Sequence, residues 1–155
     1  MKIAIGSDHG GYKEKEEIKK YLKETLGHDV TDLGTYSTER CDYTDYALLV
    51  AQAVSSKKCD LGILIDGAGI GSSIMANKVP GIRAACANEI TTAINSREHN
   101  GANVLCMGSG IIGVAVMKNI VKEWLSHDLN GDRNIRRVGK IVEFERRLNE
   151  LRDGK

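Results

Sequence analysis

The sequence lacks an excess of charge of either sign, because 22 lysines and arginines stand against 21 aspartates and glutamates. This balance argues against a basic face of the kind that binds nucleic acid, and against an acidic tail. Apolar runs long enough to span a bilayer are also missing, and the N-terminal run, residues 1–6, has no signal-peptide layout. We therefore expect a cytoplasmic protein that binds neither nucleic acid nor membranes.

Paired cysteines and metal-binding motifs are absent as well. The four cysteines, Cys41, Cys59, Cys86 and Cys106, are widely separated and form no CxxC pair. Cys86 and Cys106 fall in apolar, strand-like runs, which favours reduced core cysteines over a disulfide framework. No cluster of histidine, cysteine and carboxylate residues has the spacing of metal ligands, so we expect no metal site.

Internal repeats, low-complexity segments and linkers are missing too, and 155 residues suit a single domain, 1–155, with its own core. The chain instead alternates apolar strand-like runs with helical patterns. Strands are expected at 3–5, 29–34, 61–65, 82–87 and 104–107, and helices at 12–26, 46–56, 90–97, 112–125 and 135–153. This alternation predicts an α/β fold: one Rossmann-like domain with a five-stranded parallel sheet in the order 2-1-3-4-5 and helices on both faces.

The last predicted helix differs from the others because it is heavily charged. Its apolar residues, Ile141, Phe144, Leu148 and Leu151, alternate at spacings of three and four. So narrow an apolar seam suits a helix that docks on a partner subunit, but packing on the chain's own domain fits the pattern equally well. In the first case, segment 131–155 contributes to a dimer interface.

The stretch from Leu61 to Ser73 carries the most informative pattern. An apolar run ends in Asp66, and Gly67, Gly69 and Gly71 follow at alternate positions. A glycine loop that opens a helix leaves backbone N–H groups free to bind an anion. A carboxylate repels anions, so Asp66 either takes part in chemistry or orients the loop. A P-loop is excluded, since no Gly-Lys-Ser/Thr follows, and a dinucleotide fingerprint would belong to the first strand–helix turn instead.

In an open parallel sheet, ligands bind beyond the carboxyl ends of the strands, where the strand order reverses. Polar or glycine-rich clusters follow the first, third and fifth predicted strands, at 6–11, 66–72 and 108–110. If the first and third strands are adjacent, their clusters face one crevice, and we expect His99 and Asn100 within reach of it. Asp8 could instead cap the following helix, and His9 could be a solvated loop residue.

With these residues assembled, the chain resembles the ribose-5-phosphate isomerase B family, which includes the LacA and LacB subunits of galactose-6-phosphate isomerase. The resemblance runs from Met1 to about Arg147 and is carried by several motifs in order. They are Gly6-Ser-Asp-His-Gly-Gly, Gly34-Thr-Tyr-Ser, Asp42-Tyr, Gly67-x-Gly-x-Gly71, Ala76-Asn-Lys-Val-Pro-Gly-Ile-Arg83, Arg97-Glu-His-Asn100-x-Ala-Asn103 and Arg133-x-x-x-Arg137.

The resemblance implies an aldose–ketose isomerase of a phosphorylated sugar that needs neither a metal nor an organic cofactor. It assigns catalysis to Asp66 as base and His99 in ring opening, substrate binding to Asp8, His9, Gly67, Gly69, Gly71, Ser72 and Asn100, and phosphate binding to Arg133 and Arg137. The two arginines would reach in from the partner subunit of a homodimer, which could pair further into a tetramer. One base, N–H donors for an oxyanion and two planar arginines suit this reaction.

The chain departs from the family pattern near the expected site. Many members have Cys where this chain has Asp66, and some have Glu where it has Ser72. Ala68 replaces a usual Thr or Ser, Gly110 a common Arg, and Asn134 a usual His; the aspartate at 66 resembles LacA. A solvated aspartate is a weak base at neutral pH, so Asp66 as base would need desolvation, which a site closed by a partner subunit could provide. Gly110 and Asn134 would loosen phosphate binding or admit a different sugar.

Three hypotheses about function follow. The first is an isomerase with ribose 5-phosphate as its default substrate and galactose 6-phosphate or a tetrose phosphate as alternatives. The second is a non-catalytic or assisting, LacA-like subunit in which Asp66 only organises the loop. The third is a nucleotide-binding module.

Overall fold

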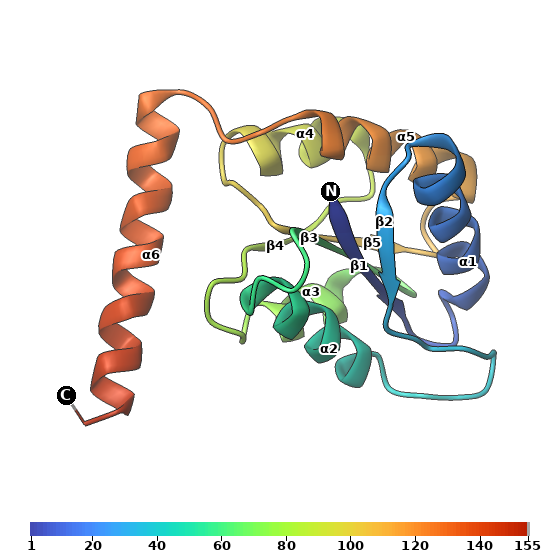
Figure 1. Cartoon of the computed structure of the whole chain (residues 1–155), viewed down its shortest axis with the longest axis horizontal. Coiled ribbons are helices and arrows are strands. Elements are labelled where there is room, and N and C mark those ends of the chain that lie inside the picture. Colours follow the sequence, from blue (N-terminus) through green and yellow to red (C-terminus); the bar gives the residue numbers. More distant parts are fainter. Residues whose placement is uncertain (155) are drawn as a thin grey trace.

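The computed structural model describes residues 1–154 as a parallel sheet covered by helices on both faces (Figure 1). The strands are β1 (Lys2–Ser7), β2 (Asp29–Asp32), β3 (Leu61–Asp66), β4 (Ala84–Cys86) and β5 (Val104–Gly108). The helices are α1 (Tyr12–Lys20), its π-helical continuation η1 (Tyr21–Thr25), α2 (Tyr43–Ser55), α3 (Ile70–Ala76), α4 (Ile90–Glu98), α5 (Val114–Ser126) and α6 (Asp132–Arg152). The predicted α/β class is confirmed.

The core consists of two apolar layers, one on each face of the sheet. Side chains of α1, α4 and α5 pack on one face, and side chains of α2 and α3 pack on the other. Neighbouring residues of β1 alternate between the layers, because Ile3 and Ile5 belong to the first and Ala4 to the second. Both faces are therefore dry, which explains why the strands show no in–out polarity in the sequence.

The strand order is 2-1-3-5-4, so the predicted order of the last two strands was wrong. β5 is buried along its whole length and pairs with β3 on one side and β4 on the other. β4 has only three residues, none of them fully buried, which suits a sheet edge. The prediction for Cys86 was wrong for the same reason: Cys106 is buried in β5, but Cys86 is exposed on the edge strand.

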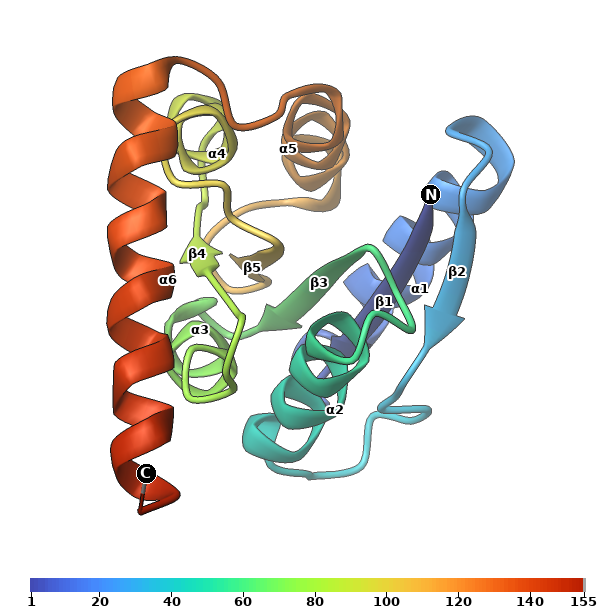
Figure 2. The same cartoon turned by 60° about the vertical axis from the view of Figure 1, so that its left-hand side comes forward.

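Helix α6 is only lightly attached to the rest of its own chain. It starts beside α4 and runs along the β4 side of the molecule (Figure 2). Asn134 and Val138 are its buried residues, whereas Ile141, Phe144, Leu148 and Leu151 are 50%, 63%, 37% and 73% exposed. Packing on its own domain therefore leaves the apolar seam uncovered. Within residues 1–154, no helix is both long and apolar enough to cross a membrane.

Candidate active site

The carboxyl ends of β1, β3 and β5 meet in one place. β1 and β3 are neighbours, as the crevice hypothesis required, and β5 lies on the other side of β3. Ser109, just after β5, links the three ends: its hydroxyl lies 3.0 Å from the Gly10 carbonyl oxygen and 3.1 Å from that of Asp66. Its N–H also donates to the Asp66 carbonyl, at 2.8 Å. Three segments distant in sequence are therefore joined by hydrogen bonds at one edge of the sheet.

Asp66 ends β3 and is 5% exposed. Its Oδ1 accepts from the N–H groups of Ala68, at 2.9 Å, and Gly69, and its Oδ2 accepts from Ser72 N–H at 2.9 Å. A carboxylate offers about four acceptor positions, so three are occupied and Oδ2 keeps one. Asp66 thus organises the loop, and only Oδ2 remains to act on a ligand.

The glycine loop, residues 66–72, needs glycine at position 69. Gly69 has φ +81°, a left-handed conformation that residues with a Cβ rarely adopt, and a Cβ there would lie 3.0 Å from the backbone of Met107. This close packing on β5 sets the path of the loop. No hydrogen bond within residues 1–154 engages the N–H groups of Gly67, Ile70 and Gly71, which leaves them as the loop's available donors.

Asp8 and His9 lie directly after β1, next to this loop. Asp8 Oδ1 accepts from Gly11 N–H at 3.0 Å, and α1 itself has no side-chain cap, so Asp8 shapes the turn before the helix. His9 is not a freely solvated residue, because its Nδ1 lies 3.1 Å from the carbonyl oxygen and 3.3 Å from the amide nitrogen of Cys41. Asp8 Oδ2 and His9 Nε2 make no hydrogen bond within residues 1–154, so each can face a ligand.

Two further residues belong to this site, and the sequence analysis gave neither a role. The Tyr43 ring packs on Gly71, where a Cβ would come within 2.6 Å of it. Asn88 joins the glycine loop to β5: its Nδ2 donates to the Ala68 carbonyl at 3.0 Å and its Oδ1 accepts from Gly108 N–H at 2.7 Å. Asn88 follows β4, so the rule that selected Asp8 after β1 could also have found it.

Cys86 lies near the loop but is poorly suited to replace the cysteine that is common at position 66 in the family that the sequence resembles. Burial, and then the charge of Asp66, raise the pKa of the Cys86 thiol. The protonated thiol lies 3.5 Å from the Ala68 carbonyl oxygen and donates to it, behind the loop. Cys86 therefore supports the loop rather than providing a thiolate.

His99 and Asn100 are not within reach of this crevice in the same chain, so that expectation was wrong. They end α4, which runs antiparallel to the strands and delivers the chain to the start of β5. Asn103 contacts residues at the amino ends of β3 and β4: its carbonyl accepts from Gly62 N–H and its N–H donates to the Arg83 carbonyl. A strand rises about 3.3 Å per residue, so the part of β3 from Gly62 to Asp66 alone separates this edge from Asp66 by roughly 13 Å.

Arg133 and Arg137 lie at the same amino-terminal edge as His99. The segment leading into α6 is held there, because Asn130 N–H donates to the Glu98 carbonyl at 3.0 Å. The two arginines are four residues apart, on one face of α6, exposed, and without an ion pair within residues 1–154. Asn134 is buried instead, and its Nδ2 donates to the Asn130 carbonyl.

The predicted site residues of one chain therefore fall into two separate groups, which we call half-sites. The first comprises Asp8, His9, Tyr43 and the glycine loop at the carboxyl ends of the strands, and the second comprises His99, Asn100, Arg133 and Arg137 at the amino ends. The first offers a carboxylate, an imidazole and N–H donors, and the second offers two guanidinium groups, an imidazole and an amide.

Comparison with known proteins gives consistent matches. Residues 3–141 match the family described as Ribose/Galactose Isomerase. Ribose-5-phosphate isomerase B of Escherichia coli strain K12 is 47% identical over 148 residues, covering 96% of this chain and 99% of that protein.

Solved structures of ribose-5-phosphate isomerase B enzymes are similar to this chain over nearly its whole length. That of Clostridium thermocellum ribose-5-phosphate isomerase B has a TM-score of 0.92 at 51% identity, covering 96% of this chain and 99% of the other. The enzyme of Mycoplasma genitalium, solved with bound ribulose 5-phosphate, has a TM-score of 0.89 at 41% identity, covering 94% and 96% of the two chains.

Proposed function

This chain belongs to the Ribose/Galactose Isomerase family and is an aldose–ketose isomerase of phosphorylated sugars, and from that premise we propose that it interconverts ribose 5-phosphate and ribulose 5-phosphate. The observation that carries the proposal is the pair of half-sites. A pentose phosphate needs a base and oxyanion donors at one end and phosphate ligands at the other, which is how the two half-sites divide. The reaction moves one proton between adjacent carbons and calls for no cofactor.

We place the complete site at the contact between two chains in a homodimer. The half-sites of one chain are on opposite edges of its sheet, so a two-fold axis must bring the first half-site of one chain to the second half-site of the other. The exposed apolar seam of α6 supplies a surface for this contact. It lines a groove of about 380 Å³ with Ile82 and Asn100 of its own chain. His99 and Asn100 would then reach the substrate from the partner, together with Arg133 and Arg137.

In the proposed mechanism, His99 of the partner subunit assists ring opening, and Asp66 Oδ2 takes the proton from carbon 2 of the open aldose. The electron pair of that C–H bond forms the double bond between carbons 1 and 2, and the carbonyl oxygen on carbon 1 becomes an oxyanion. Gly67, Ile70 and Gly71 N–H groups donate to the enediolate. A proton passes between its two oxygens, and Asp66 returns its proton to carbon 1, leaving a ketone at carbon 2.

A second function is favoured by one observation, the three N–H groups already bound to Asp66. A carboxylate so engaged is suited to holding the loop in shape. In this alternative the chain binds the sugar phosphate but needs a related chain to supply the base, as an assisting subunit.

A turnover panel separates these functions and identifies the sugar. Purified protein is assayed with tetrose, pentose and hexose phosphates, each as aldose and ketose. We expect the highest kcat/KM with ribose 5-phosphate and ribulose 5-phosphate, in the absence of added metal. Because sugar phosphates are charged and retained inside cells, we expect the protein to act in the cytoplasm. Binding without turnover of any sugar phosphate would favour the assisting subunit, and a response to nucleotides alone would favour the binding module.

A further inference from the structure

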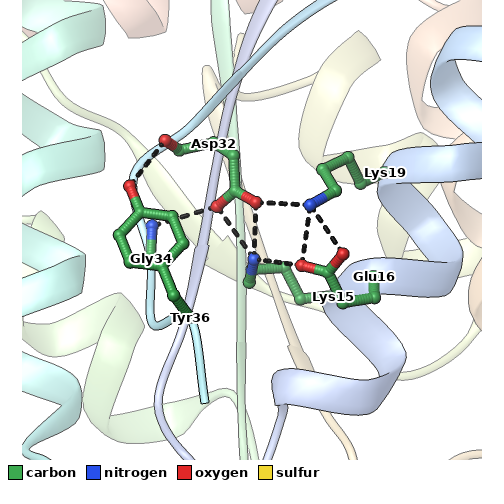
Figure 3. A network of polar contacts seen from close by, with 6 residues as sticks. All are labelled: Lys15, Glu16, Lys19, Asp32, Gly34 and Tyr36. Atoms are coloured by element: carbon green, nitrogen blue, oxygen red, sulfur yellow. Dashed lines mark hydrogen bonds and ion pairs between the residues drawn. The ribbon is translucent and has the colours of Figure 1, made fainter.

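A buried lysine lies at the centre of a polar network behind the first half-site. Lys15 of α1 is fully buried, and its Nζ lies 2.8 and 2.7 Å from the two carboxylate oxygens of Asp32 and 2.8 Å from Glu16 Oε1 (Figure 3). The same ammonium lies 5.6 Å from the ring centres of Tyr12 and Tyr36. A buried ammonium is costly unless it is paired, so Lys15 fixes the place of Asp32.

Lys19 and Glu16 complete the network on its outer side. Lys19 Nζ lies 2.7 Å from Asp32 Oδ2 and 2.7 Å from Glu16 Oε1. Burial alone would raise the pKa of Asp32, but hydrogen bonds from Lys15, Lys19 and Gly34 N–H outweigh it and lower that pKa. Asp32 is therefore ionised at neutral pH and remains an acceptor for all three.

Asp32 in turn fixes the chain that follows β2. Its Oδ1 accepts from Gly34 N–H at 3.0 Å, and its backbone carbonyl accepts from the Tyr36 hydroxyl at 3.0 Å. The turn held in this way pairs with the end of β1: Ser7 N–H donates to the Gly34 carbonyl at 2.7 Å, and Thr35 N–H donates to the Ser7 carbonyl at 2.8 Å. Ser7 immediately precedes Asp8 and His9.

The same connection holds the His9 ring. Cys41, six residues after Thr35, lies against His9 Nδ1 through its backbone. Both supports of His9, the pairing of Ser7 with Gly34 and Thr35 and the ring contact at Cys41, come from the segment that follows Asp32. We infer that Lys15 and Asp32 are positioning residues that set the orientation of His9 toward the sugar phosphate; the catalytic side of this inference rests on the proposed function.

The test compares Lys15→Met with Lys19→Met, its matched control, which removes the outer lysine on the same carboxylate. Imidazole signals of His9, His28, His99 and His127 are followed by ¹H–¹⁵N NMR of the full chain, alongside kcat and KM. We expect Lys15→Met to shift the His9 signals alone and to lower kcat/KM on the order of 100-fold, as small misplacements in active sites do. Lys19→Met should leave both close to wild type, because Lys19 is partly solvated.

A double variant, Lys15→Met/Asp32→Leu, covers the case in which the single variant does not fold, because it leaves neither charge of the pair buried alone. It should show the same His9 shift. Unchanged His9 signals in a folded variant, or equal shifts of all four histidines, would overturn the inference. The NMR result does not depend on turnover, so failure of the inference and failure of the proposed function are distinguishable.

Discussion

Replacing Asp66 by asparagine should lower kcat/KM for ribose 5-phosphate by a factor on the order of 10²–10⁴, the usual contribution of a positioned base. Asparagine keeps the carbonyl acceptor for Ala68 and Gly69 N–H but loses the second carboxylate oxygen, which is both the proposed base and the acceptor for Ser72 N–H. The loss of this buried hydrogen bond, which leaves the Ser72 N–H without an acceptor, costs about 1–3 kcal/mol of folding stability. Steady-state turnover, with thermal unfolding measured in parallel, checks both expectations.

The variant Asp66→Cys is the matched control, because it restores the base that many family members have at this position. If Asp66 is a base, Asp66→Cys should turn over far faster than Asp66→Asn, although a thiolate cannot hold three N–H groups as a carboxylate does. If Asp66 only holds the loop, both variants should lose activity together. Wild-type turnover by Asp66→Asn would contradict the proposed role of this residue.

A heterodimer of two inactive variants should recover about half of the wild-type activity, because one of its two sites would be intact. The pair is Asp66→Asn, which damages the first half-site, and Arg137→Ala, which damages the second. Each variant alone should be nearly inactive: loss of the arginine removes one of two guanidinium groups from the phosphate. The chains are co-expressed with different affinity tags, and dimers that carry both tags are purified before the assay.

The matched control for this experiment pairs Asp66→Asn with His9→Ala. Both substitutions lie in the first half-site, so a heterodimer of these chains has no intact site and should stay inactive. Recovery in this control, or its absence in the Asp66→Asn and Arg137→Ala pair, would refute a site shared between two chains.

Much of this architecture could be predicted from the sequence. Strands buried on both faces produce continuous apolar runs, and the stripe of Met117, Ile120, Val121 and Trp124 on α5, fully buried in the structure, follows the helical period. The position of the crevice could also be predicted on the condition that strands one and three are neighbours. The structure meets this condition, and the polar clusters after the two strands share an edge of the sheet. These features depend on local periodicity and on one topological rule.

The errors came from features that depend on the assembled sheet. Nothing in Ala84–Cys86 distinguishes an edge strand from an inner one except its shortness, which became clear only from its pairing with β5. The error in placing His99 could have been avoided from the sequence, because a helix between two parallel strands must return the chain to their amino ends. Applied to the predicted helix 90–97, this rule would have placed His99 away from Asp66 and suggested that it serves the partner's site.

The hydrogen bonds of Asp66 could not be predicted, since they depend on the path of residues 67–72. Gly69 adopts φ +81° and packs on Met107, and this turn directs two loop N–H groups onto Oδ1. The sequence indicated that Asp66 either reacts or orients the loop. In the structure it orients the loop, and one acceptor position on Oδ2 remains free for a ligand.

The most direct test of the central claim, that this chain moves a proton through an enediolate at Asp66, is isomerisation in deuterium oxide followed by NMR. The wild-type protein should convert ribulose 5-phosphate to ribose 5-phosphate that carries solvent deuterium at carbon 2 in at least part of the product. Ribose 5-phosphate formed without any deuterium would contradict a proton that exchanges with solvent at the enediolate stage, as would the absence of any product.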